Sequence, residues 1–180
     1  HSYARLVEVS EPVINEFLMP KVFERTLAIA REHLARGEQV WIVTASPQQL
    51  AGILAEKLGL TGALGTVAQI VDGEFTGELE GPILHGGEKA VAITKLASER
   101  GIDLSRSTAY SDSMNDQPML SAVGHAVAVN ADRRLRALAR KSGWDAVDFR
   151  RSRLARKYSV HAGIVALVTA VAGVVRRRRP

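Results

Sequence analysis

The sequence predicts an α/β protein whose core is a doubly wound parallel sheet with helices on both faces. Three observations point to this class. Short apolar runs of strand length alternate along the chain with segments of helical periodicity. Polar residues follow two of these runs directly, at Thr44 and at Asp112. An apolar fraction of 46% over 180 residues suits a globular domain with a real core.

The first third of the chain is expected to hold two helices, a strand and a third helix. Apolar residues recur near the 3.6-residue period over Glu11–Arg36, and Gly37 ends the pattern. Pro20 interrupts it, so two helices that meet there are expected. Gln39–Val43 is an apolar run that suits a buried strand, and Gln48–Leu58 follows as a helix.

The middle of the chain predicts a hairpin and then a helix. Gly65–Val71 is expected to be a strand, and Asp72-Gly73 is a turn signal. Glu74–Leu79 is then the hairpin partner of that strand. The segment 82–87 is a loop that leads into a helix over Glu88–Arg100.

The remaining ordered part continues the alternation of strands and helices. Strands are expected at Ser107–Ser111, Gly124–Val129 and Trp144–Phe149. A short helix over Asp116–Val123 and an arginine-rich helix over Ala131–Ser142 connect them. Because helical crossovers join parallel strands, the carboxyl ends of these strands should lie at one edge of the sheet, where such folds bind ligands.

Charge is divided unevenly along the chain. Residues 1–132 carry ten Lys/Arg and seventeen Asp/Glu, a net charge of −7, whereas residues 133–180 carry fourteen Lys/Arg and two Asp/Glu, a net charge of +12. The basic tail encloses an apolar run at 158–175 that a helix would stretch to roughly 27 Å, just short of a bilayer core. We consider three roles for this run: membrane insertion or surface association, a packed C-terminal helix, or a basic tail that is disordered or contacts nucleic acid.

A hydroxyl motif and a lysine form the first half of a candidate phosphoryl-transfer site. Thr44, Ala45 and Ser46 stand at a strand end, where hydroxyl groups and the N–H groups of the next helix can donate hydrogen bonds to a phosphate. Lys89, in the first turn of a later helix, supplies a fixed positive charge.

An acidic pair forms the second half. Asp112 follows the strand at Ser107–Ser111, and Asp116 lies four residues later. Mg²⁺ binds a few carboxylates and several waters, so Asp112 and Asp116 are candidate metal ligands. Asp116 is also a candidate to orient Lys89.

Each of these residues also has a simpler explanation. Thr44 or Ser46 could serve as the N-cap of a helix that begins at Pro47. Lys89 could be a solvated helix residue, and Asp112 and Asp116 could be turn or cap residues. The ordered combination of hydroxyl, lysine and acidic pair is what favours a phosphoryl-transfer site.

Four segments resemble the haloacid dehalogenase superfamily, and in particular its subfamily IB, the phosphoserine-phosphatase-like hydrolases: ThrAlaSerPro, GEFTGELEGPILHGGEKA, AYSDSMNDQPML and AVNADRRLRALARKSGW. The resemblance covers about residues 10–150. It implies a Rossmann-like core and Mg²⁺-dependent hydrolysis of phosphomonoesters. By position, the resemblance implies that Thr44 is the family's phosphate-binding hydroxyl, Lys89 its lysine and Asp112 its Mg²⁺ ligand. Asn115 matches a phosphate-contacting asparagine.

The chain departs from this family at the nucleophile. The family uses the first aspartate of an Asp-x-Asp-x-Thr motif on its first, central strand, and no aspartate precedes Asp72 here. We therefore expect a sheet without its first central strand and a chain that is N-terminally truncated. The expected organisation is a remnant of a helical cap at 1–36, a catalytic core at 37–150 and the basic, apolar tail at 151–180.

The expected function is that of a Mg²⁺-dependent phosphatase of small phosphorylated metabolites, phosphoserine-like, which acts through an aspartyl phosphate. This chain alone is expected to be inactive because it lacks the nucleophile. The alternative is a non-catalytic module that binds phosphate or Mg²⁺ and is tethered to a membrane by its tail. Nucleic acid is disfavoured as a partner, since the body is acidic and aromatic and basic residues are not interleaved. A bacterial, cytoplasmic protein that contacts membranes through 151–180 is expected, of undetermined oligomeric state.

Overall fold

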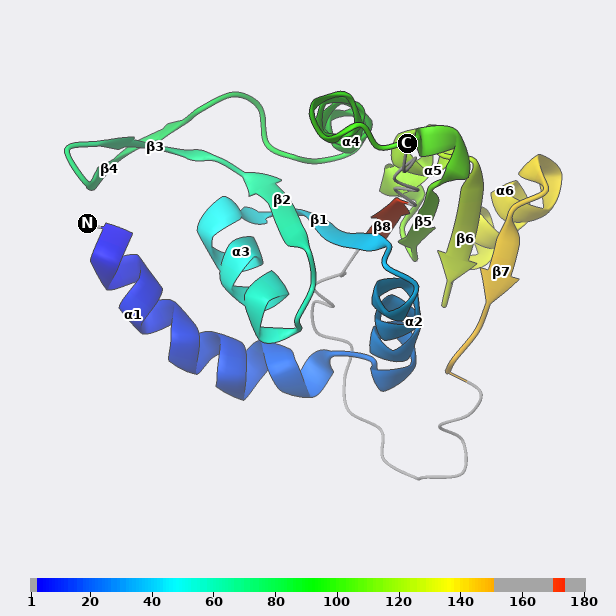
Figure 1. The fold of residues 1–180 in the computed structure, drawn as a ribbon, viewed down its shortest axis with the longest axis horizontal. Coiled ribbons are helices and arrows are strands. Elements are labelled where there is room, and N and C mark those ends of the chain that lie inside the picture. Colours follow the sequence, from blue (N-terminus) through cyan, green and yellow to red (C-terminus); the bar gives the residue numbers. More distant parts are fainter. Residues whose placement is uncertain (1–2, 151–169, 174–180) are drawn as a thin grey trace, which may run out of the picture.

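The predicted α/β class with a parallel sheet is confirmed. A computed structural model describes residues 3–150 and 170–173 of the chain. Six strands form one sheet in the order β2-β1-β8-β5-β6-β7, and a separate β3-β4 hairpin extends to one side (Figure 1). The strands are β1 (Gln39–Pro47), β2 (Gly62–Thr66), β3 (Ala68–Val71), β4 (Glu74–Leu79), β5 (Thr108–Ser111), β6 (His125–Val129), β7 (Asp145–Val147) and β8 (Ala170–Gly173).

Helices connect the strands of this sheet. Four short helices, η1 to η4, accompany six α-helices within the described residues. They are α1 (Tyr3–Val13), η1 (Ile14–Leu18), η2 (Met19–Lys21), α2 (Glu24–Ala35), α3 (Gln48–Lys57), α4 (Gly87–Arg100), η3 (Leu104–Arg106), η4 (Met114–Asp116), α5 (Gln117–Ser121) and α6 (Arg133–Ser142). 

Two apolar clusters, one on each face of β1, make up most of the core. Ile42 packs with Ile14 and Leu27, whereas Val43 belongs to the cluster that holds Ile93 and Ala109. Successive side chains of a strand point to opposite faces, so the unbroken apolar run of β1 is explained by burial on both sides. This burial fixes β1 in the sheet and thereby places the polar residues that follow it.

The position between β1 and β5 is filled by β8. This strand, which is red in Figure 1, pairs antiparallel with both neighbours. The other pairs, β1 with β2, β5 with β6 and β6 with β7, are parallel. No parallel strand lies between β1 and β5 among the described residues, as expected from the absence of the family's first strand, and β8 supplies backbone partners to both of them.

The N-terminal helices differ from the prediction in their bounds. Helical structure begins at Tyr3 and not at Glu11, because α1 runs into the π-helix η1 and then into the 3₁₀ turn η2. The expected break at Pro20 is confirmed, since Pro20 lies in η2 and α2 begins only at Glu24.

The single strand predicted over Gly65–Val71 is wrong. The segment divides at Val67: β2 stays in the main sheet beside β1, and β3 leaves it to pair with β4. We attribute the division to Thr66, which is buried at the end of β2. Its hydroxyl donates to the Ala45 carbonyl (2.8 Å) and accepts from the Leu84 N–H (3.1 Å). The predicted turn at Asp72-Gly73 and its hairpin are confirmed.

The apolar tail run at 158–175 lies mostly outside the described residues. At 170–173 the structure has a strand, so the alternative of a packed C-terminal helix is wrong at these four residues. Among the residues that the structure describes, no helix is long and apolar enough to cross a membrane.

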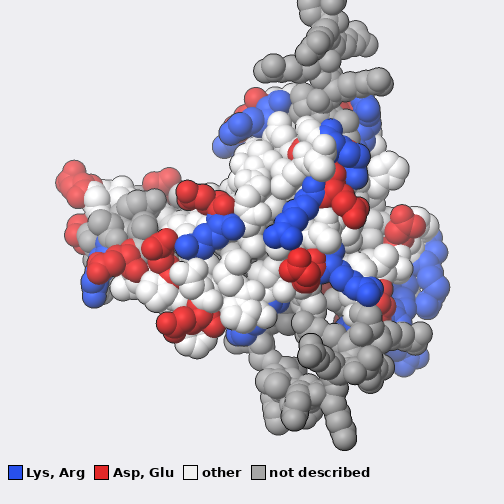
Figure 2. Space-filling model, turned by 60° about the horizontal axis from the view of Figure 1, so that its bottom comes forward, with Lys and Arg blue, Asp and Glu red and all other residues white. Residues whose placement is uncertain are grey.

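Charge is distributed over the surface as the sequence predicts for the described part of the chain. In Figure 2 basic side chains gather at the right-hand edge, where α6 lies in Figure 1, and acidic ones are frequent toward the opposite end, where the β3-β4 hairpin lies. Helix α6 carries four arginines and one lysine and no acidic residue. The acidic body and the basic C-terminal side are therefore different regions of the surface.

Candidate functional site

The carboxyl ends of the parallel strands bring the predicted site residues toward one edge of the sheet. Thr44–Ser46 form the end of β1, and Asp112 directly follows β5. Helix α4, which carries Lys89 in its first turn, contacts both β1 and η4. Residues distant in the sequence therefore reach this edge from three elements, as the alternation of strands and helices predicts.

Lys89 and Asp116 form a buried ion pair. Lys89 Nζ lies 2.7 Å from Asp116 Oδ1, and the two side chains are only 8% and 2% exposed. The hydroxyl of Ser111, at the end of β5, donates to the other carboxylate oxygen of Asp116 at 2.7 Å. The simpler interpretation of Lys89 as a solvated residue is wrong, since burying a lysine is costly unless it is paired.

Both oxygens of Asp116 therefore have partners. Asp116 stands at the N-cap position of α5 but makes no capping hydrogen bond, so the cap interpretation of this residue is wrong. A positive charge in the first turn of a helix is repelled by the positive end of the helix dipole. The Asp116 carboxylate offsets this repulsion at Lys89, which lies in the first turn of α4. Of the two roles considered for Asp116, this geometry favours orienting Lys89 over ligating a metal.

Asp112 is the half-buried carboxylate of the site. Burial raises its pKa above the ordinary value, and the nearby carboxylate of Asp116 raises it further, while Lys89 and Arg150 act in the opposite direction. Asp112 has no ion pair in the part of the chain that the structure describes. A cation stabilises the charged form of a partly buried carboxylate that lies beside a second carboxylate. Asp112 therefore has the environment expected of a Mg²⁺ ligand.

A metal at Asp112 would depend largely on water. The described residues contain no cluster of three or more His, Asp or Glu side chains that could hold an ion. Mg²⁺ keeps several waters and needs only one or two carboxylates, so the donor set at Asp112 fits this ion. The expected sharing of a metal by Asp112 and Asp116 stays a prediction.

The hydroxyl motif lies at the end of β1 and is not used to cap α3. The N-cap of α3 is Pro47, which has no side-chain capping bond, so the N-cap interpretation of Thr44 and Ser46 is wrong. Instead, the Thr44 hydroxyl donates to Ser46 Oγ at 3.2 Å and accepts from the Ser46 N–H at 3.2 Å. Ala45 is exposed between them, so the motif faces outward from the sheet edge.

Asn115 lies in the turn η4 next to the loop that precedes α4. Its side chain is exposed, and its N–H donates to Ser113 Oγ at 3.2 Å. Its carbonyl oxygen comes close to Gly86, where a built Cβ would lie 3.8 Å away. Gly86 has a positive φ of 57°, so the loop before Lys89 and the acidic turn meet through a residue type that tolerates this backbone.

Three residues of this edge were missed by the sequence analysis. Ser111 orients Asp116, Thr66 joins the Ala45 and Leu84 segments, and Arg150 lies close enough to influence Asp112. A signal existed for Ser111 in the Ser-Asp-Ser sequence at the strand end. No local pattern marks Thr66 or Arg150, because their partners are distant in the sequence.

Comparisons with known proteins identify relatives of this chain. A model of haloacid dehalogenase-like hydrolases matches residues 1–121. The phosphoserine phosphatase SerB1 of Mycobacterium tuberculosis is 49% identical over 180 residues, which are 99% of this chain and 58% of that protein. The chain thus spans less than two thirds of the length of this relative.

Two solved structures share the fold. A protein of unknown function from Bordetella pertussis Tohama I superimposes with a TM-score of 0.76 at 29% identity, over 82% of this chain and 68% of its own. A substrate-bound phosphoserine phosphatase complex superimposes with a TM-score of 0.54 at 27% identity, over 73% of this chain and 62% of its own.

Proposed function

The chain belongs to the haloacid dehalogenase-like hydrolase family, and we propose that the protein is a Mg²⁺-dependent phosphatase of small phosphorylated metabolites. The relatives that carry the name phosphoserine phosphatase support a phosphoserine-like substrate. The observation that carries the proposal is the buried Lys89–Asp116 pair with Asp112 beside it at the end of β5. A buried ion pair is in itself weak evidence for stability, and buried charged groups cluster at functional sites, which supports a functional role for Lys89.

The chemistry follows from where charge develops during phosphoryl transfer. The transferred group spreads negative charge over its oxygens, so fixed donors and cations lower the barrier. Lys89, held by Asp116, presents its ammonium group to one of these oxygens. The Thr44 hydroxyl and the N–H groups near the start of α3 donate to the others.

Asp112 is the residue that would hold Mg²⁺, with waters completing the ion's coordination. A bound Mg²⁺ neutralises phosphate oxygens and so complements Lys89. Asn115 is proposed to contact the phosphate from the η4 turn. The aspartyl phosphate of the proposed reaction needs a nucleophilic aspartate, and none precedes Asp72 in these 180 residues. We therefore attribute binding of phosphate and Mg²⁺ to this chain, and not the complete reaction.

The test is a titration of the 180-residue chain with Mg²⁺ and inorganic phosphate by isothermal titration calorimetry. Mg²⁺ should bind to the unaltered chain and not to Asp112→Asn, whereas Asp145→Asn, which removes an exposed carboxylate of β7, should bind as before. Absence of Mg²⁺ binding in the unaltered chain, or its retention in Asp112→Asn, would contradict the metal assignment. Mg²⁺-dependent hydrolysis of O-phosphoserine by these 180 residues alone would contradict the inference about the nucleophile.

A further inference from the structure

Two surfaces of opposite charge lie at opposite ends of the molecule. The β3-β4 hairpin extends from one end, and α6 lies at the other (Figure 1). Acidic side chains are frequent toward the end with the hairpin, and basic ones gather at the edge where α6 lies (Figure 2). Neither surface contains a residue of the proposed phosphate site, so each calls for an explanation of its own.

Helix α6 presents its positive charges on one face. Its exposed cations, here the α6 cations, are Arg133, Arg134, Arg140 and Lys141. Positions 133, 137, 140 and 141 follow the i, i+4, i+7, i+8 pattern of a single helix face. On the other side of the helix Leu135 and Ala139 are buried. The α6 cations make no ion pair with any residue that the structure describes.

The hairpin carries negative charge alone. No lysine or arginine lies between Lys57 and Lys89 in the sequence. Three exposed carboxylates of this region, Asp72, Glu78 and Glu80, are here the hairpin carboxylates. None of the three forms an ion pair with another side chain of residues 3–150. The hairpin therefore offers carboxylates whose charge is not balanced within the described part of the chain.

Exposed apolar side chains stand among these carboxylates. Val71 is 53% exposed and is paired with Glu74 across the hairpin. Leu79 is 43% exposed and lies between Glu78 and Glu80 in the sequence. An arginine can lay its apolar stem over such side chains while its guanidinium group pairs with a carboxylate. This mixture of carboxylates and apolar side chains therefore suits an arginine-rich partner.

The hairpin also lacks the support of further strands. Among the described residues β3 and β4 form a sheet of two strands, separate from the main sheet. A two-stranded hairpin is marginally stable by itself in water, so a partner that covers it would stabilise it. A second hairpin is a poor partner, because pairing two of them would bring like charges together.

We propose that copies of this chain associate head to tail, with α6 of one copy docked on the β3-β4 hairpin of the next. Charge complementarity selects this partner, since the α6 cations and the hairpin carboxylates are of opposite sign and both are exposed. The two surfaces lie at opposite ends, so a pair of copies joined by one contact still has a hairpin and an α6 face available. Association of this kind is not limited to dimers. The inference is independent of the proposed function.

Sedimentation equilibrium of the 180-residue chain tests the association. At about 50 mM NaCl the average mass should rise with protein concentration beyond that of two chains, and at about 500 mM it should return to that of one chain, because salt screens exposed charges. A single-chain mass at both salt concentrations would overturn the proposal. A mass that levels off at two chains would also overturn it, since it indicates a closed dimer.

Two charge-reversal variants identify the surfaces. Glu78→Lys with Glu80→Lys makes the hairpin basic, and Arg133→Glu with Arg134→Glu makes the first turn of α6 acidic. Each double variant alone should lose association, because its two surfaces then carry like charges. An equimolar mixture of the two should recover it, since each hairpin then meets an α6 face of opposite charge. Recovery in the mixture also shows that both variants are folded.

Matched controls change the same charges elsewhere. Glu56→Lys with Glu99→Lys alters exposed carboxylates of α3 and α4, and Lys21→Glu with Arg106→Glu alters exposed cations. Both control variants should associate like the unaltered chain. Association that survives in either charge-reversal variant would overturn the proposal, as would equal loss in the controls.

A neutral variant guards against misfolding of the charge-reversal variants. Glu78→Gln with Glu80→Gln introduces no new charge and should weaken the association constant roughly five- to tenfold at low salt, the effect of two exposed ion pairs. An unchanged association constant in this variant would overturn the role of the hairpin.

Discussion

The Nζ atom of Lys89 lies 2.7 Å from Oδ1 of Asp116, although 27 residues separate them and both side chains are almost completely buried. Lys89 lies in the first turn of α4 and Asp116 at the start of α5, so the pair joins two helices beneath the carboxyl edge of the sheet. Ser111 fixes the carboxylate from the end of β5. The position of the proposed phosphate-binding lysine is thus set by the acidic turn.

Lys89→Met should both destabilise the fold and abolish phosphate binding. Removing one partner of a buried ion pair leaves the other charge buried, which typically costs about 3–5 kcal/mol. We expect urea unfolding to show a loss of that size and calorimetry to show no binding of inorganic phosphate. Lys95→Met is the control on the same helix: its side chain is 76% exposed, so the free energy of unfolding should change by less than about 0.5 kcal/mol. Equal stability of the two variants would contradict the buried pair.

Two glycine substitutions should have effects of opposite sign. A Cβ at Gly124 would lie 1.7 Å from the Ser105 carbonyl oxygen, so Gly124→Ala forces the backbone before β6 away from η3. Such crowding should cost about 1–3 kcal/mol or more in unfolding free energy. Gly52, in the middle of α3, has nothing within 4 Å of a built Cβ, and Gly52→Ala should stabilise by roughly 0.5–1 kcal/mol. Urea unfolding of both variants measures the difference, and a shift in the same direction would be inconsistent with the packing at Gly124.

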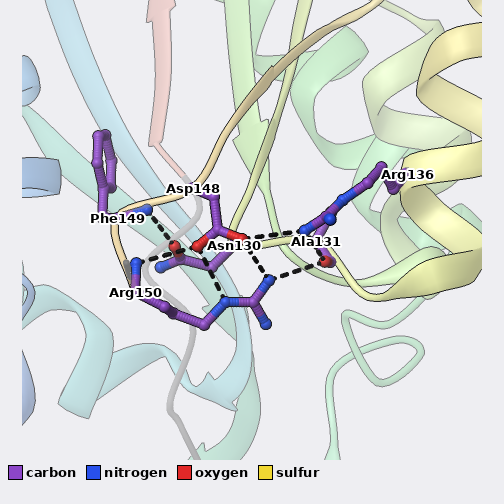
Figure 3. Close-up of polar contacts among 6 residues, drawn as sticks. All are labelled: Asn130, Ala131, Arg136, Asp148, Phe149 and Arg150. Carbon is purple, nitrogen blue, oxygen red and sulfur yellow. Dashed lines mark hydrogen bonds and ion pairs between the residues drawn. The ribbon is translucent and has the colours of Figure 1, made fainter. Parts of the chain in front are cut away.

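Asp148, which accepts hydrogen bonds from Arg136 and Arg150 (Figure 3), should make a pH-dependent contribution to stability. Hydrogen bonds from Arg150, with the charges of Arg150 and Arg136, hold the pKa of Asp148 well below its ordinary value of 3.8. A lowered carboxyl pKa stabilises the fold at every pH above the unfolded value, and this contribution is lost as the pH falls through the folded pKa. Asp148→Asn should therefore lower the melting temperature by a constant amount between about pH 5 and pH 8.

Below about pH 4 the difference between Asp148→Asn and the unaltered chain should shrink, because Asp148 is then increasingly protonated in the unfolded reference state. Thermal unfolding across this range measures it. Asp145→Asn, three residues earlier on exposed β7, is the control and should have no such effect. A difference that persists unchanged at the lowest pH would mean that the charge of Asp148 contributes nothing.

The sequence predicted the elements that depend on local patterns, and it failed where distant contacts decide. The strand at Gln39–Val43 and the helix after it could be predicted because apolar runs and glycine stops are local signals. The division of Gly65–Val71 could not, since it depends on Thr66 reaching Ala45 and Leu84. 

The same distinction between local patterns and distant contacts applies to the candidate site. Lys89, Asp112 and Asp116 were identified from their order and residue types, but their roles became distinct only through burial and pairing. Likewise, no local pattern shows that His33 Nε2 lies 2.8 Å from the hydroxyl of Tyr110, because 77 residues separate the two. The two side chains join α2 to β5 in a partly buried network, whereas a surface or simple packing role is the default for an isolated histidine.

The pairing of β8 makes a prediction about the C-terminal part of the chain. Val171 is paired with Trp41 of β1 and with Ala109 of β5, so its backbone lies in the middle of the sheet. A proline there has no N–H and removes one bond of the ladder, leaving a buried acceptor without its donor. Val171→Pro should lower the free energy of unfolding by about 1–3 kcal/mol in urea.

Deleting residues 151–180 should be more severe than Val171→Pro, because it removes β8 and leaves the facing edges of β1 and β5 without backbone partners. Deleting only 176–180 keeps all four residues of β8 and serves as the control. Hydrogen exchange of the β1 and β5 amides should accelerate in the first deletion and not in the second. Unchanged exchange and stability after removal of 151–180 would mean that the tail lies outside the core. That result would favour the expectation that the tail is free to contact membranes.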